Sequence, residues 1–186
     1  PVTRTVTLAP GEVGELATRG PQVALGYFND PERTARTFRE DGWLFSGDLA
    51  TMDGDGYIRL VGRIKDIVNR GGLKISVREI EELLLAHGAF STVAVVAVPD
   101  AKLGEKSCAF VVPRAQEAPD PAEIIVYLES KGVAKYKMPE YFVPLRELPM
   151  TASGKIQKFQ LRDGFVDGIY SPVSPKSRKE SVAGNA

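Results

Sequence analysis

Hydrophobic and polar residues alternate along much of the first third of the chain, as they do in half-buried β-strands. The stretches VTRTVTL (residues 2–8) and GELATRG (residues 14–20) show this alternation, and turn-forming residues stand between them. A later stretch, TMDGDGYIRLVGR (residues 51–63), predicts a tight turn at Asp53–Gly56 that leads into a strand. Residues 1–62 are therefore expected to be rich in short strands.

Three places carry the signals of a helix start. Asp30 can cap a helix over the sequence NDPERTARTFRE, because a proline follows it at the first helical position. Ser76 and Glu79 have the spacing of a capping box and precede an apolar helical face. Asp120 and Pro121 repeat the cap-and-proline pattern before another apolar face.

Continuous apolar runs predict buried strands in the second part of the chain, at TVAVVAVPD (92–100), SCAFVVP (107–113) and YFVPL (141–145). A loop, LPMTASGKIQKFQLR (148–162), is expected next. Residues 169–186, rich in Ser, Pro and Lys, are expected to be a disordered tail. The pattern predicts an α+β fold. A β-rich segment precedes a small domain with a mixed or antiparallel sheet and flanking helices, and the boundary falls near residues 62–67.

Composition excludes several classes of function. The 24 basic and 24 acidic residues balance, so no strong field points to nucleic acid or to an anionic membrane. With one cysteine, Cys108, and one histidine, His87, an internal disulfide is excluded, and no metal site on the chain is expected. No apolar run is long enough to span a bilayer, and a cytoplasmic location is predicted. The start, which lacks a methionine, suggests the C-terminal piece of a longer protein.

Two familiar motifs can be excluded. Gly154-Lys155 is not a Walker P-loop, because the first glycine of that motif is missing and no Ser or Thr follows the lysine. The DGDG sequence resembles a calcium loop only briefly, because its twelfth position is Ile64 where an acid is required. A structural turn is the better interpretation of DGDG.

Two residues are candidates for binding a nucleotide. Asp48 follows Ser46-Gly47 at the end of an apolar run, and its carboxylate could accept two hydrogen bonds from a ribose diol. A turn-forming aspartate is the alternative. Arg63 offers a planar fork for phosphate or ribose oxygens, but with Lys65 and Asp66 it could equally form a surface ion-pair cluster.

Two loops could complete a site. Gly71 and Gly72 let the backbone approach a ligand closely, or they form a plain turn between a strand and a helix. Lys155 follows a loop of small residues and could meet a phosphate and a carboxylate, or it is a solvated surface lysine. A unit charge pair about 4 Å apart is worth about 4 kcal/mol at an effective dielectric constant of about 20. Such a lysine would be effective in a transition state.

The order of these features is more specific than any one of them. The series GYFNDPERTARTF, WLFSGD, GRIKDIVNRGGLKIS, LGEK and LPMTASGKIQKFQLR resembles the acyl-adenylate-forming superfamily. That superfamily includes acyl-CoA synthetases, nonribosomal-peptide adenylation domains and firefly-type luciferases. The resemblance runs from Gly11 to about Phe165. It implies that residues 1–62 end a large AMP-binding domain in a β-barrel-like subdomain, that 63–67 form a hinge, and that 68–168 form a mobile C-terminal domain.

The resemblance also implies roles for single residues. Asp48, in WLFSGD, matches the acid that binds the ATP ribose, and Arg63 matches an arginine that reaches the nucleotide. Lys65 falls on the hinge position. Gly71 and Gly72 lie on the loop that faces the pantetheine of CoA.

Lys155 matches the lysine that contacts the acyl carboxylate and the phosphate. The implied reaction uses a carboxylic acid and Mg²⁺-bound ATP to form an acyl-adenylate and pyrophosphate, after which CoA displaces AMP. The small domain presents Lys155 in the first step and turns about Lys65 for the second. The implied partners are the acid, ATP, CoA and an upstream N-terminal domain of the same protein.

Some features of the superfamily are missing. Its phosphate-binding loop, adenine-binding segment and acyl pocket lie upstream of these motifs, so the 186 residues alone are expected to be inactive. Asn69 stands where some luciferases have a lysine, which disfavours a luciferase. The sequences GEKSCAFVV and AKYKMPEYF favour a ligase for aryl, alicyclic or medium-chain fatty acids. Two alternatives remain: an adenylation enzyme that loads a carrier-protein phosphopantetheine, and a non-catalytic binding module.

Overall fold

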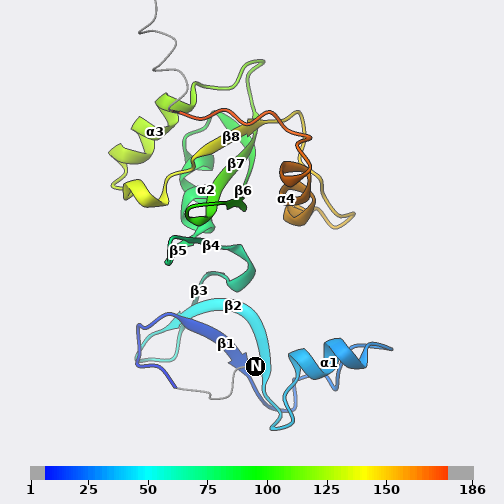
Figure 1. The fold of residues 1–186 in the computed structure, drawn as a ribbon. Coiled ribbons are helices and arrows are strands. Elements are labelled where there is room, and N and C mark those ends of the chain that lie inside the picture. The colour runs from blue at the N-terminus through cyan, green and yellow to red at the C-terminus, as the bar shows by residue number, and fades with distance from the viewer. Residues whose placement is uncertain (1–6, 176–186) are drawn as a thin grey trace, which may run out of the picture. The chain divides into compact units, whose positions relative to one another are not determined.

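The computed structural model describes residues 7–175 (Figure 1). The chain divides into two compact units, Pro1–Lys65 and Asp66–Ala186, called here the first and second unit. Each is described by itself. Within the described residues, no helix is both long and apolar enough to cross a membrane.

The first unit contains a three-stranded antiparallel sheet in the order β1-β2-β3 and one short helix. Its elements are β1 (Gly14–Thr18), α1 (Pro31–Thr37), β2 (Leu44–Met52) and β3 (Ile58–Arg63). The predicted turn before β3 is confirmed, because the carboxylate of Asp53 accepts the backbone N–H groups of Asp55 and Tyr57. The stretch 2–8, predicted as a strand, lies mostly outside the described residues.

The start of α1 agrees with its sequence signal, but its end does not. The side chain of Asp30 accepts the N–H of Arg33 at 2.9 Å, so Asp30 is the predicted cap. The helix stops at Thr37, where the sequence predicted a longer one. Phe38 is extended and forms a β-bridge with Leu44, so pairing with the sheet takes the place of a further helical turn.

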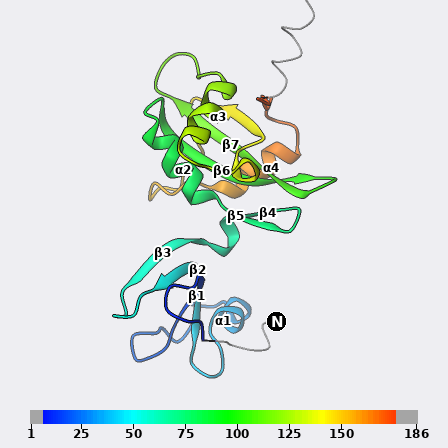
Figure 2. The same cartoon turned by 90° about the vertical axis from the view of Figure 1, so that its left-hand side faces the viewer.

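The second unit is a mixed five-stranded sheet with helices on both faces (Figures 1 and 2). The strands run β5-β4-β7-β6 and are antiparallel, while β8 pairs with β7 in parallel. Its elements are η1 (Ile64–Asp66, which begins in the first unit), β4 (Ile67–Arg70), β5 (Leu73–Ser76), α2 (Val77–Ala86), β6 (Phe90–Asp100), β7 (Gly104–Pro113), α3 (Pro121–Ser130), η2 (Lys135–Lys137), β8 (Tyr141–Pro144) and α4 (Lys158–Val166). This is the predicted small α+β domain.

Two hydrophobic cores explain why β6 and β7 have continuous apolar runs, at residues 93–98 and 108–112. Along β6, Val93 and Val95 pack in the core that α2 and α3 cover, while Ala94 and Val96 pack in the core that α4 covers. Successive side chains of a strand point to opposite faces. A strand with helices on both faces therefore loses the polar alternation that a half-buried strand shows.

Two predictions about the start of α2 and the segment before α4 need correction. Ser76 does stand at the start of α2, but its side chain forms no capping hydrogen bond, and Glu79 pairs with Lys137 at 2.7 Å. The predicted loop 148–162 is in fact a tight turn followed by the beginning of α4.

The predicted disordered tail, residues 169–186, begins too early. The ring of Tyr170 packs against Phe110 with centroids 5.1 Å apart, and Val173 exchanges two backbone hydrogen bonds with Phe142. These contacts cover the α4 side of the sheet and its edge at β8, so they order the chain up to this point. Residues 176–186 lie outside the described residues.

Cys108 is expected to be unreactive in the folded chain. It lies on β7, fully buried, and burial raises the pKa of its thiol far above the usual range. Since the thiolate is the reactive form, we expect a thiol reagent to label Cys108 only after the sheet opens. Labelling followed by mass spectrometry should be slow in buffer and fast in denaturant. Labelling in buffer at the rate of a free cysteine would contradict the buried position.

Candidate functional site

The two candidate nucleotide residues are cross-strand partners. The register of β2 and β3 places Asp48 opposite Arg63, and Arg63 Nε lies 2.6 Å from Asp48 Oδ1. Asp48 is the more enclosed of the two, with 26% of its side chain exposed against 63% for Arg63. From the sequence, two alternatives were open: Asp48 could be a turn-forming residue, and Arg63 could form an ion-pair cluster with Lys65 and Asp66. The structure instead pairs the two candidates with each other.

Polar contacts fix the backbone around Asp48. The Ser46 hydroxyl donates to the carbonyl of Leu16 at 2.9 Å and accepts the N–H of Asp48 at 3.0 Å. The N–H of Gly47 donates to the Glu15 carboxylate at 3.1 Å. Gly47 has φ of +74°, which an L side chain rarely adopts. The sequence Ser-Gly-Asp therefore orients the carboxylate through a bend tied to β1.

Lys65 lies in the single turn η1, between β3 and β4, and is the last residue of the first unit. A short connection of this kind can absorb the dihedral change of a domain rotation. Its role as a hinge stays a prediction.

Gly71 and Gly72 form the turn of the β4–β5 hairpin, so a strand, not a helix, follows them directly. Both have positive φ, +56° and +88°. The N–H of Gly71 donates to the carbonyl of Leu103 at 2.7 Å, and an added Cβ there would lie 3.3 Å from the Leu103 side chain. An added Cβ on Gly72 would have no atom within 4 Å. Gly71 is therefore packed, whereas the backbone of Gly72 is open.

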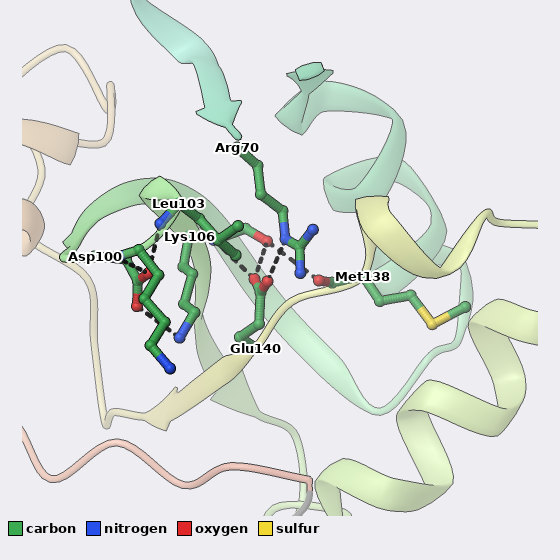
Figure 3. A network of polar contacts seen from close by, with 8 residues as sticks. Arg70, Asp100, Leu103, Lys106, Met138 and Glu140 are labelled. Carbon is green, nitrogen blue, oxygen red and sulfur yellow. Dashed lines mark hydrogen bonds and ion pairs between the residues drawn. The ribbon is translucent and has the colours of Figure 1, made fainter. Parts of the chain in front are cut away.

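An ion pair fixes the turn end of this hairpin (Figure 3). Arg70 Nε lies 2.6 Å from Glu140 Oε1, and Glu140 Oε2 accepts the backbone N–H and the hydroxyl of the buried Ser107. On the neighbouring residue, the N–H of Asn69 donates to Glu105 at 2.8 Å. Because both carboxylates hold backbone groups, the hairpin is tied to β7 and to the start of β8. Glu140 could not be identified from the sequence, since 70 residues separate it from Arg70.

A second ion pair, between Lys106 and Asp100, closes the β6–β7 connection (Figure 3). Lys106 Nζ lies 2.6 Å from Asp100 Oδ2, and Asp100 Oδ1 accepts the N–H groups of Lys102 and Leu103. The bond from Lys106, with these backbone donors, lowers the pKa of Asp100 from 3.8 to about 2. A lowered pKa means that the pair stabilises the fold above pH 4, and that its contribution is lost as the pH falls towards 2.

A groove of about 950 Å³ lies beside the glycine hairpin. It reaches the hairpin at Arg70 and the adjoining β6–β7 connection at Leu103, and it passes along α3 and η2. The side chains in it that could meet a polar ligand include Lys106, Lys135 and Tyr136. The groove was not predicted, because residues from five separate elements of the second unit, β4, β7, α3, η2 and β8, line it together with residues of the connecting segments.

Lys155 is carried by a closed turn, not by a loose loop. The backbone N–H of Thr151 donates to the carbonyl of Lys155 at 2.8 Å, and the N–H of Lys155 donates to the Thr151 hydroxyl at 3.0 Å. Met150 and Ile156 form a β-bridge, and Gly154 has φ of +79°. The Lys155 side chain is exposed, and among residues 7–175 its ammonium group has no hydrogen bond or ion pair. It is presented to solvent on a fixed backbone.

The structure thus brings together Asp48 and Arg63 in the first unit. In the second unit it places the glycine pair and Lys155 on separate turns. No group of His, Cys, Asp and Glu residues within the described part of the chain is arranged to hold a metal ion.

Residues 79–155, which end on this lysine, match the family model of the AMP-binding enzyme C-terminal domain. The chain belongs to the acyl-adenylate-forming superfamily. The medium-chain fatty-acid–CoA ligase of Escherichia coli strain K12 is a superfamily relative that is 52% identical over 168 residues, or 90% of this chain and 30% of the ligase. The 2,3-dihydroxybenzoate-AMP ligase of Bacillus subtilis strain 168 is 45% identical over 162 residues, or 87% of this chain and 30% of that enzyme.

A solved structure of the same superfamily has a similar fold. The crystal structure of ATP-bound MatB from Rhodopseudomonas palustris superposes with a TM-score of 0.77 at 36% identity, over 85% of this chain and 31% of MatB. The chain therefore spans about 30% of the length of the superfamily members that it matches.

Proposed function

We propose that the chain is the C-terminal part of an AMP-forming acid–CoA ligase. In the first step an acid carboxylate attacks the α-phosphorus of ATP, and pyrophosphate leaves. In the second step the sulfur of CoA, having lost its proton, attacks the acyl carbonyl, and AMP leaves. The observation that carries this proposal is the 52% identity to a CoA ligase across 90% of the chain.

The Asp48–Arg63 pair is suited to hold the nucleotide. The Asp48 carboxylate can accept hydrogen bonds from both hydroxyls of a ribose, and Arg63, 2.6 Å away, keeps the carboxylate in one orientation. The pair alone is a weak source of stability, since exposed ion pairs contribute about 0.2 to 1 kcal/mol. We therefore assign it to ligand binding.

Lys155 is suited to the adenylation step. An exposed ammonium group on a fixed turn can be placed beside the carboxylate and the α-phosphate, where negative charge crowds in the transition state. It would supply electrostatic stabilisation and transfer no proton. Magnesium would accompany ATP as its usual counter-ion and would be held mainly by the phosphates.

The glycine hairpin is suited to the thioester step. Gly72 has no side chain and no neighbouring atom that would block a pantetheine chain. The adjoining groove has room for more of CoA and offers Lys135 and Tyr136 to a phosphate and a base. These features favour free CoA as the acceptor.

A carrier-bound phosphopantetheine is the second candidate acceptor. The similarity to 2,3-dihydroxybenzoate-AMP ligase, at 45% identity, supports it, and an open Gly72 would serve a pantetheine arm from either source. The acid itself is not assigned, because the acyl pocket of the superfamily lies outside these residues. We expect the 186 residues alone to be inactive for the same reason, and the cytoplasmic location stays a prediction.

The proposal is tested with the complete protein, ATP, Mg²⁺ and a panel of fatty and aromatic acids. We expect acid-dependent exchange of labelled pyrophosphate into ATP, followed by thioester formation with free CoA. Faster transfer to a holo carrier protein than to CoA would favour the second acceptor. If none of the acids in the panel supported pyrophosphate exchange, the result would count against the proposal.

Lys65→Pro is expected to slow the thioester step more than adenylation. Proline fixes φ at residue 65 and disfavours the helical conformation of Ile64 in η1, so rotation about this segment would be restricted. Single-turnover rates of both steps in the complete enzyme measure the effect, with Lys65→Ala as the control for loss of the side chain. An unchanged second step would remove the hinge assignment.

A further inference from the structure

Lys158 lies at the centre of an ion cluster next to the Lys155 turn. It is the first residue of α4 and follows Lys155 by three positions. Its Nζ lies 2.8 Å from Glu81 Oε1 and 3.6 Å from Asp66 Oδ2. All three side chains are largely enclosed, with 24%, 18% and 31% exposed, respectively. The charges therefore interact with less screening than a surface pair would.

Glu81 is itself held in place from the sheet. Its Oε1 also accepts the backbone N–H of the buried Val95 at 2.7 Å. Because β6 is at the edge of the sheet, the N–H groups that point away from β7 have no strand partner, and Glu81 satisfies one of them. A single carboxylate on α2 thus joins β6 to the start of α4.

Asp66 connects the cluster to the inter-unit segment. It is the last residue of η1 and directly follows Lys65. Lys158 therefore touches the segment proposed as the hinge on one side and the rigid α2–β6 layer on the other. Between Lys158 and Lys155 only Ile156 and Gln157 intervene, and the N–H of Gln157 donates to the carbonyl of Pro149 at 2.8 Å.

We propose that Lys158 is a positioning residue for Lys155, which clamps the base of the Lys155 turn onto Glu81 and Asp66. This role rests on the proposed function, since it acts through the adenylation lysine. The turn closes on itself through Thr151, but those bonds fix only its internal shape. The Lys158 cluster, together with the packing of Ile156 against the core that α4 covers, sets its orientation on the domain. A displacement of about 1 Å in a catalytic group can cost about a hundredfold in rate.

The test uses the complete enzyme with Lys158→Ala, Lys158→Arg and the matched control Lys137→Ala. Lys137 forms an ion pair of similar length, 2.7 Å, with Glu79 on the same helix α2, and it has similar exposure, but it is remote in sequence from the Lys155 turn. We expect Lys158→Ala to lower kcat for pyrophosphate exchange by about 10- to 100-fold, with KM values for acid and ATP nearly unchanged. Lys158→Arg should restore much of the rate, and Lys137→Ala should resemble wild type.

A double variant separates positioning from general damage. If Lys158 acts through Lys155, then Lys158→Ala should add little to the loss already caused by Lys155→Ala. Thioester formation from a supplied acyl-adenylate should stay near the wild-type rate. The proposal would be overturned if the two fold-losses in rate multiplied in the double variant. It would also be overturned if Lys158→Ala slowed adenylation and thioester formation equally, or had the wild-type rate.

Hydrogen exchange gives a readout that does not depend on activity. In Lys158→Ala we expect the amide of Gln157, which donates to Pro149 at the base of the turn, to exchange faster than in wild type, while those of the central sheet do not. Unchanged protection of the turn would overturn the positioning role even if the enzyme were active. A protein that shows no exchange of pyrophosphate with any acid, but loses protection at the turn, would instead contradict the proposed function and leave the clamp supported.

Discussion

Lys155→Ala is expected to reduce acyl-adenylate formation by the complete enzyme by about 10²- to 10³-fold, the usual cost of removing one preorganised group that stabilises transition-state charge. The side chain is exposed on a closed turn, and its ammonium group forms no hydrogen bond or ion pair with the described part of the chain that its loss would break. The change should therefore leave folding intact. Burst measurements of acyl-adenylate formation report the first step directly.

The same variant should accept a supplied acyl-adenylate and form the thioester at close to the wild-type rate. Lys131→Ala removes another exposed lysine, at the end of α3, and is the control for a change in surface charge. Equal losses in both steps would show that Lys155 is not specific to adenylation, and the role proposed for it would have to be abandoned.

The second large effect is expected from Gly72→Leu, which should slow thioester formation by about a hundredfold or more while adenylation changes only severalfold. A side chain at this position would occupy the open face of the hairpin, where an interfering group can misplace the reacting sulfur. The positive φ of +88° adds strain of about 1 to 2 kcal/mol for an L-residue. Rapid-quench assays of the two steps separate the effects.

Gly88→Leu is the matched control. Gly88 has a similar φ of +82°, and a Cβ there would also have no atom within 4 Å. It follows α2, away from the hairpin in sequence, so Gly88→Leu should show the same backbone strain with no selective loss of the second step. If the two variants behaved alike, the effect at Gly72 would be one of stability, and the pantetheine assignment would fail.

The sequence predicted the elements of the second unit well where local signals agreed. The β6 run is apolar because both faces of the sheet are covered, and the Asp120-Pro121 signal begins α3 as expected, with the Asp120 carboxylate accepting the N–H of Ala122. Helix α4 was missed, because its sequence contains Gly164 and turn residues precede it. The structure explains this glycine, since an added Cβ would lie 2.7 Å from the ring of Tyr170.

The candidate site was only partly predictable. The motifs identified Asp48 and Arg63 separately. The turn at Asp53 sets the register only from Met52 to Ala50, and a shift between Ala50 and Leu49, which the sequence did not predict, places Asp48 opposite Arg63. The partners of Lys158 and Arg70 could not be predicted, because their carboxylates come from other elements far away in the sequence. No local propensity encodes such pairs, and only the folded sheet brings them together.

We expect the complete protein to activate an acid as its adenylate and to transfer the acyl group to CoA. The most direct measurement is the identity of the products formed from ATP, Mg²⁺, CoA and a panel of acids, with nucleotides separated by chromatography and thioesters identified by mass spectrometry. AMP and acyl-CoA should form in equal amounts, and only when a suitable acid is present. Formation of ADP in place of AMP would contradict this activity, and so would a failure of every acid in the panel to cause AMP formation.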